Sequence, residues 1–322
     1  MRARRPVYIL FSSLLLLSLV SVNGRPQEAG RSEQTESFPQ SHLIRVSTNL
    51  VTVPVSVTDA LGHPVRNLQI ADFVVEEDGR PETLTGIADP GQTPLELALL
   101  VDVSGSVEPR FTFELQAAAR FLRRVLRQED TFAVFSIGPQ PGLVQSRTAN
   151  LEEGLRSVTT LVPTRDSTAF YDAVVMAAQF LGRNHTLGCR RIQVVISDGE
   201  DNNSESHRLA DALQEVQRAD CVFYSINPAG ASIHLNKVSL EGQRGMDELA
   251  RKTGGKTYVP DQVTDLDAFF DRITSEIRAQ YLLEYYSSDQ RKNGAYRQIS
   301  VRLPSRPDLQ IHARHGYYAA TG

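Results

Sequence analysis

One acidic residue and two hydroxyl residues stand at alternate positions directly after a long apolar run. The run covers residues 97–101, and the polar residues are Asp102, Ser104 and Ser106. Such a run is typical of a strand that is buried on both faces. The polar residues then fall where the strand ends, which is the edge where open α/β sheets bind ligands. A carboxylate and two hydroxyls at this edge predict a hard, all-oxygen site suited to Mg²⁺, Mn²⁺ or Ca²⁺.

Two later segments carry further oxygen-bearing side chains in similar contexts. Thr168 precedes a stretch with helical spacing, and Asp198 follows a β-branched apolar run at residues 192–196. With these residues the chain resembles the von Willebrand factor type A family. The metal-ion-dependent adhesion site of that family combines D-x-S-x-S, a distant Thr before a helix and an Asp after the fourth strand. The resemblance covers about residues 94–280 and implies five ligands for one ion, namely Asp102, Ser104, Ser106, Thr168 and Asp198.

Apolar runs alternate with amphipathic stretches through the same part of the chain. This alternation predicts βαβ units that form a doubly wound, mostly parallel α/β sheet with helices on both faces. Strands are expected at residues 97–103, 131–137, 142–147, 191–197, 222–226 and 256–259, with 142–147 as an edge strand. Helices are expected at residues 111–126, 168–181, 207–218, 246–252 and 266–280.

Short segments of alternating apolar and polar residues flank this α/β domain on both sides. Residues 42–90 contain three or four such segments, and residues 281–318 contain three more. We therefore expect one β-sandwich, built from both flanks, into which the A-type domain at residues 94–280 is inserted. The flanks, with V-T-D-x-x-G-x-P-V and a closing R-H-G-Y, are similar to exported bacterial proteins that carry a domain related to von Willebrand factor type A.

The N-terminus has the pattern of a secretory signal peptide. Arg2, Arg4 and Arg5 precede an apolar stretch at residues 7–20, and small residues suited to cleavage end at Gly24. We expect residues 1–24 to be removed and residues 25–41, which are poor in apolar side chains, to form a disordered linker. A retained anchor helix is the alternative. The expected location is secreted, periplasmic or at the cell envelope, with no membrane span after cleavage.

Export affects the expected oxidation state of the two cysteines, because an oxidising compartment favours disulfides. Cys189 and Cys221 lie just before the strands expected at residues 191–197 and 222–226. In the fold implied by the resemblance these strands are parallel neighbours. Both cysteines would then lie at the amino-terminal edge of the sheet, and we expect a disulfide between them.

Four acids near the expected ligands have alternative roles. Asp166 is either a solvated loop acid or a sixth ligand. Asp172, one turn into its helix, is either a cap or a support for the ligands. Glu200 and Asp201 are expected at the rim of the site or as caps of the next helix.

The chemistry of the expected site favours binding over catalysis. Three of the ligands are neutral hydroxyls, so a bound Mg²⁺ would keep positive charge and an open position that an Asp or Glu of a partner protein could fill. The formal charge of −4 gives no sign of nucleic-acid binding. The chain is thus interpreted as a metal-dependent, adhesion-type protein-binding module without catalytic residues. The alternatives are a Mg²⁺-dependent phosphoryl-transfer enzyme with Asp102 as nucleophile, and a structural envelope protein with a stabilising metal site.

Overall fold

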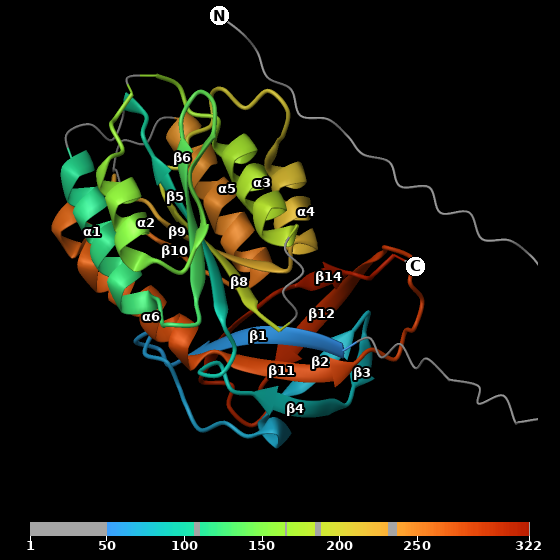
Figure 1. Ribbon diagram of the computed structural model, residues 1–322. Coiled ribbons are helices and arrows are strands. Elements are labelled where there is room, and N and C mark those ends of the chain that lie inside the picture. Colours follow the sequence, from blue (N-terminus) through green and yellow to red (C-terminus); the bar gives the residue numbers. More distant parts are fainter. Residues whose placement is uncertain (1–49, 106–109, 165, 184–187, 231–236, 322) are drawn as a thin grey trace, which may run out of the picture. The chain divides into compact units, whose positions relative to one another are not determined.

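A six-stranded sheet forms the centre of the α/β part of the protein (Figure 1). The structure, a computed structural model, describes residues 50–105, 110–164, 166–183, 188–230 and 237–321. The strand order is β10-β9-β8-β5-β6-β7, and all neighbours are parallel except β6 and β7. The strands are β5 (Leu95–Asp102), β6 (Thr131–Ile137), β7 (Gly142–Thr148), β8 (Arg190–Ile196), β9 (Cys221–Ile226) and β10 (Thr257–Tyr258). The expected edge strand is confirmed as β7, and every residue of β5 is buried, as its unbroken apolar run predicts.

Helices cover both faces of this sheet. One face packs against α1 (Phe111–Val125), α2 (Leu151–Thr159) and α6 (Leu266–Ala279). The other packs against α3 (Phe170–Gly182), α4 (Leu209–Arg218) and α5 (Lys237–Thr253). Figure 1 shows the sheet between these two layers. The predicted doubly wound architecture is therefore confirmed, and α2 is a helix that the periodicity did not indicate.

The helix expected at residues 246–252 is longer than predicted, because α5 begins at Lys237. Gly242 and Gly245 interrupt the sequence pattern, and glycine has low helix propensity. Both glycines are closely packed, and Gly242 lies against backbone. A Cβ on Gly242 would come within 2.5 Å of the Gly199 backbone, and one on Gly245 within 2.6 Å of the Tyr171 hydroxyl. Tertiary contact therefore overrides local preference over this stretch.

Two further sheets form the β-sandwich, and each combines strands from both ends of the chain. One has the order β13-β1-β11-β4 and the other β14-β12-β2-β3. Val53 pairs with Leu283 between β1 and β11, and Val75 pairs with Val301 between β2 and β12. The predicted sandwich of N- and C-terminal segments is thus confirmed. Its strands are β1 (Leu50–Thr58), β2 (Val74–Glu77), β3 (Arg80–Glu82), β4 (Leu84–Ala88), β11 (Tyr281–Tyr286), β12 (Tyr296–Arg302), β13 (Gln310–Ala313) and β14 (Gly316–Tyr318).

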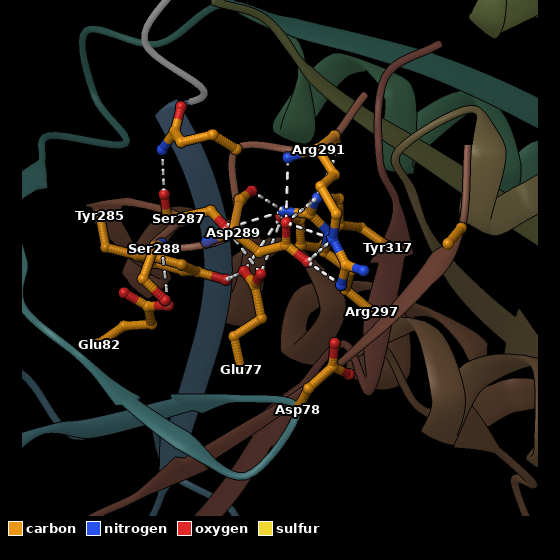
Figure 2. A network of polar contacts seen from close by, with 12 residues as sticks. Glu77, Asp78, Glu82, Tyr285, Ser287, Ser288, Asp289, Arg291, Arg297 and Tyr317 are labelled. Carbon is orange, nitrogen blue, oxygen red and sulfur yellow. Dashed lines mark hydrogen bonds and ion pairs between the residues drawn. The ribbon is translucent and has the colours of Figure 1, made fainter. Parts of the chain in front are cut away.

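A buried polar network joins the two sheets of the sandwich (Figure 2). Its centre is the Glu77 carboxylate on β2, which is 3 % exposed. Tyr285, on β11 of the other sheet, donates a hydrogen bond to this carboxylate at 2.8 Å. Ser287, which follows β11, donates another at 2.6 Å. Tyr317 donates at 3.0 Å, and Arg297 forms a buried ion pair with it at 3.2 Å. Charges are retained in such a core only when paired and hydrogen-bonded, and this one meets both conditions.

Candidate metal centre

Asp102 is the last residue of β5, an inner strand of the parallel sheet. Its side chain is fully buried. Its Oδ1 accepts a hydrogen bond from the backbone N–H of Ser104 at 2.9 Å, and its Oδ2 accepts one from the Ser197 hydroxyl at 2.6 Å. The carboxylate is therefore fixed between the loop that follows β5 and the loop that follows β8. A fixed orientation is what a metal ligand requires.

Asp198 stands in the loop after β8 and is 7 % exposed. Its Oδ1 accepts the N–H of Glu200 at 3.1 Å, while the N–H of Gly199 donates to the Ser197 hydroxyl at 3.0 Å. Gly199 has a φ of +76°, a left-handed conformation that favours glycine. A Cβ there would also come within 2.7 Å of the Met246 side chain. Gly199 thus shapes the turn that carries Asp198.

Thr168 lies two residues before α3 and is 3 % exposed. Its N–H donates to Asn202 Oδ1 at 2.7 Å, and its carbonyl accepts the N–H groups of Asn202 and Asn203 at 3.1 and 3.0 Å. The loop of Thr168 is therefore joined to the loop of Asp198. The structure thus gathers Asp102, Ser104, Thr168 and Asp198 at the carboxyl edge of the sheet, whereas Ser106 lies outside the described residues.

The neighbouring acids support this edge in ways that only the structure shows. Asp201 Oδ1 accepts the N–H of Phe170 at 2.9 Å, so it caps α3 rather than the next helix in sequence. Asp172 Oδ2 accepts the N–H of Glu205 at 3.1 Å, and its Oδ1 lies 2.7 Å from His207 Nδ1. The Oε1 of Glu200 accepts a hydrogen bond from the hydroxyl of Ser239. Asp166 is an exposed loop residue.

Sequence reasoning missed Ser197 and Asn202 as parts of this arrangement. Both belong to the Ser-Asp-Gly-Glu-Asp-Asn stretch that contains Asp198. A hydroxyl directly before the predicted ligand was the available signal for Ser197. For Asn202, the tendency of Asn side chains to bond nearby backbone groups in loops was the signal, but it does not identify Thr168 as the partner.

The electrostatics of the site fit a cation. Burial raises the pKa of Asp102 to about 6, hydrogen bonds from Ser197 and Ser104 oppose this shift, and the charge of Asp198 adds to it. A bound cation would favour the ionised forms of both acids. The donor set, carboxylate and hydroxyl oxygens, is the one that Mg²⁺ and Mn²⁺ prefer.

In the part of the chain that the structure describes, no cluster of three or more His, Cys, Asp or Glu side chains could hold a metal.

The disulfide expected between Cys189 and Cys221 is not present, and both residues are thiols. On the neighbouring strand, the residue opposite Cys221 is Arg191. Cys189 therefore lies two residues before the position opposite Cys221. Two residues along a strand and one strand spacing across it separate Cα atoms by about 8 Å. A disulfide needs a Cα separation of about 4.4–6.8 Å. The strands are neighbours as expected, but their register places the two thiols out of reach.

Comparison with known proteins relates the α/β part of the chain to one family. Residues 97–200 match the family model of the von Willebrand factor type A domain, a range that contains Asp102, Ser104, Thr168 and Asp198. The chain therefore contains a von Willebrand factor type A domain. No curated protein sequence matches the chain.

Several solved structures resemble the chain at low sequence identity. A von Willebrand factor type A protein from Catenulispora acidiphila is 13% identical, with a TM-score of 0.47, over 73% of this chain and 51% of its own. An aerotolerance-related membrane protein from Bacteroides fragilis is 18% identical, with a TM-score of 0.45, over 57% and 98% of the two chains. The corresponding domain of a type V pili tip protein from Porphyromonas gingivalis is 12% identical, with a TM-score of 0.45, over 57% and 95%.

Proposed function

We propose that this protein is a metal-dependent protein-binding module of an exported protein. The observation that carries the proposal is the meeting of Asp102, Asp198 and Thr168 at the carboxyl edge of the parallel sheet. There Ser197 bridges the strand of Asp102 and the loop of Asp198. These residues, with Ser104 and Ser106, would hold one Mg²⁺, or Mn²⁺ or Ca²⁺ in its place.

The residues of the site determine how it would bind a partner. A bound Mg²⁺ would supply positive charge and a coordination position that these five residues do not fill. Asp102 and Asp198 provide at most two negative charges, while Ser104, Ser106 and Thr168 are neutral. An Asp or Glu side chain of a partner protein would therefore be attracted to this edge and could complete the ligand set. Burial of the ligands strengthens that attraction, because it lowers the local dielectric.

The alternative of a phosphoryl-transfer enzyme fits the geometry less well. A nucleophilic Asp102 would have to present an oxygen to the substrate. Its side chain is fully buried, and both of its oxygens accept hydrogen bonds within the protein. A fixed, buried carboxylate at this position suits the binding of a cation better than nucleophilic attack.

Export is part of the proposal and rests on the N-terminal sequence alone. Residues 1–49, which include the expected signal peptide and linker, lie outside the described part of the chain. Among the residues that are described, no helix is both long and apolar enough to cross a membrane. The proposed location is the cell envelope, the periplasm or the medium.

Calorimetric titration of the full chain with Mg²⁺ and Mn²⁺ tests the metal site. We expect saturable binding by the wild-type protein and none by Asp102→Ala. Asp271→Asn serves as the control for loss of a charge, because Asp271 lies on α6 and pairs with Arg124 at the surface. Equal binding by wild type and Asp102→Ala would overturn the proposal.

A second measurement separates a binding site from a purely structural one. With Mn²⁺ bound, an open coordination position holds exchangeable water and enhances water-proton relaxation. We expect this enhancement in the wild-type protein, and we expect a short Asp-containing peptide to reduce it while its Asn counterpart does not. A closed, structural site would show no such enhancement and no response to the peptide.

A further inference from the structure

A buried glutamate beside the metal centre has no role in the ligand set. Glu114 lies in the first turn of α1, the helix that follows the loop of Ser104. Its side chain is fully buried, and its Oε1 accepts a hydrogen bond from Arg110 Nε at 2.8 Å. Within the described residues, its Oε2 has no hydrogen-bond partner. A buried carboxylate oxygen without a donor is destabilising, so its presence calls for a reason other than packing.

The charges that act on Glu114 connect it to the metal centre. Burial raises the pKa of Glu114 to about 7, and Arg110, the residue just before α1, opposes this shift. The negative charges of Asp102 and Asp198, at the ends of two neighbouring strands, raise it further. Three acidic groups therefore share one water-poor region, where charges interact over longer distances than in water.

We propose that Glu114 is a positioning residue of the metal site, whose negative charge strengthens cation binding from outside the ligand set. The inference rests on the proposed function, since it needs a cation at Asp102 and Asp198. A cation there attracts the ionised form of Glu114, and by linkage the ionised glutamate raises the affinity for the cation. Arg110 limits this effect and keeps the glutamate in place when no cation is bound.

The chain offers a matched control for this proposal. Glu276 on α6 is also buried, at 3 % exposure, and its Oε2 also lacks a partner among the described residues. Burial raises the pKa of this carboxyl as well. Its Oε1 accepts a hydrogen bond from the Tyr258 hydroxyl at 2.5 Å, and the charges that act on it are those of Lys256 and Arg272. Glu276 therefore reproduces the environment of Glu114 without the metal site.

Calorimetric titration with Mg²⁺ at pH 6 and pH 8 tests the role of Glu114. At pH 8 we expect Glu114→Gln to bind Mg²⁺ roughly tenfold more weakly than wild type, the usual loss when a supporting residue of a metal site is removed. At pH 6 the difference should shrink, because the glutamate is then largely protonated in the wild-type protein. Glu276→Gln should match wild type at both pH values. A purely structural glutamate would not produce this pH-dependent difference.

A second variant separates weaker Mg²⁺ binding from a folding defect. Glu114→Leu has a similar volume and removes the unpartnered carboxylate, so thermal unfolding without metal should show no loss of stability. It should nevertheless share the weaker Mg²⁺ binding at pH 8. The inference is overturned if wild type binds Mg²⁺ and both variants bind it equally well. A wild-type protein that binds no Mg²⁺ would instead overturn the proposed function and the inference with it.

Discussion

The hydroxyl of Ser197 lies 2.6 Å from Oδ2 of Asp102 and fixes the side chain at the centre of the metal site. The same hydroxyl accepts the N–H of Gly199 at 3.0 Å. One serine therefore holds the carboxylate at the end of β5 and the turn that carries Asp198 after β8. Because both contacts are buried, water cannot replace either of them.

Replacement of Ser197 by alanine should affect both stability and metal binding. The buried Asp102 oxygen would lose its donor, which costs about 1–3 kcal/mol in the free energy of unfolding. Loss of ligand orientation should weaken Mg²⁺ binding by roughly tenfold. Chemical denaturation and calorimetric titration measure the two effects. Ser225→Ala is the control, since Ser225 is buried on β9 and its hydroxyl bonds Thr257 at 2.9 Å. It should change stability alone.

The close approach of α5 to the Asp198 turn should make Gly242 intolerant of a side chain. A Cβ at this position would lie 2.5 Å from the carbonyl of Gly199 and 2.8 Å from the nitrogen of Glu200. We expect Gly242→Ala to lower the free energy of unfolding by about 1–3 kcal/mol through overpacking. It should also weaken Mg²⁺ binding, because the turn must move.

Gly182→Ala is the matched control for that prediction. Gly182 is the last residue of α3, and the nearest atom to a Cβ there lies 3.4 Å away. Alanine is the better helix former, so stability should stay equal or rise. Equal stability of wild type and Gly242→Ala in thermal unfolding would contradict the close packing of α5 on the turn.

The polar network of the sandwich should respond strongly to the loss of Arg297. Arg297→Met would leave the Glu77 carboxylate buried without its ion-pair partner, which typically costs about 3–5 kcal/mol. Chemical denaturation measures the change. Arg302→Met removes an ion pair with Glu76 in which the Arg302 side chain is 56% exposed, so its effect should stay below about 1 kcal/mol. Similar effects of the two substitutions would refute the role given to the buried pair.

His312 should make the protein less stable in mild acid. Burial, with the nearby charge of Lys256, lowers the pKa of His312 below its usual 6.5. As the pH falls through about 6.5, the unfolded chain gains a proton that the folded protein resists, so the free energy of unfolding decreases. His312→Gln should remove this part of the pH dependence.

Buried carboxyls with a raised pKa, such as Asp102, change the free energy of unfolding in the opposite direction as the pH falls. The reason is that the folded protein takes up their protons more readily than the unfolded chain does. The comparison therefore concerns the difference between wild type and variant, measured by denaturation at pH 5.5 and pH 8. His63→Gln, at an exposed side chain, is the control. Identical pH dependence in wild type and His312→Gln would contradict the prediction.

The sequence by itself indicated most strands and helices of the α/β domain, although not α2, and the position of Asp102 at the end of a buried strand. Alternating segments on both flanks also indicated one shared sandwich, although not which strands pair in it. These features follow from hydrophobic periodicity, which is a local property of the chain. An unbroken apolar run specifies a strand buried on both faces, and alternation specifies a strand with one buried face.

Only the tertiary structure decided which groups meet at the site and which do not. The strand register places Cys221 opposite Arg191, so the disulfide with Cys189 does not form. The contact between Gly242 and Gly199 allows α5 to run through two glycines that a local pattern would exclude. The approach of the loop after β8 to α3 makes Asp201 the cap of that helix. Register and backbone contact depend on segments that are distant in sequence, and for that reason the pattern within any one segment does not contain them.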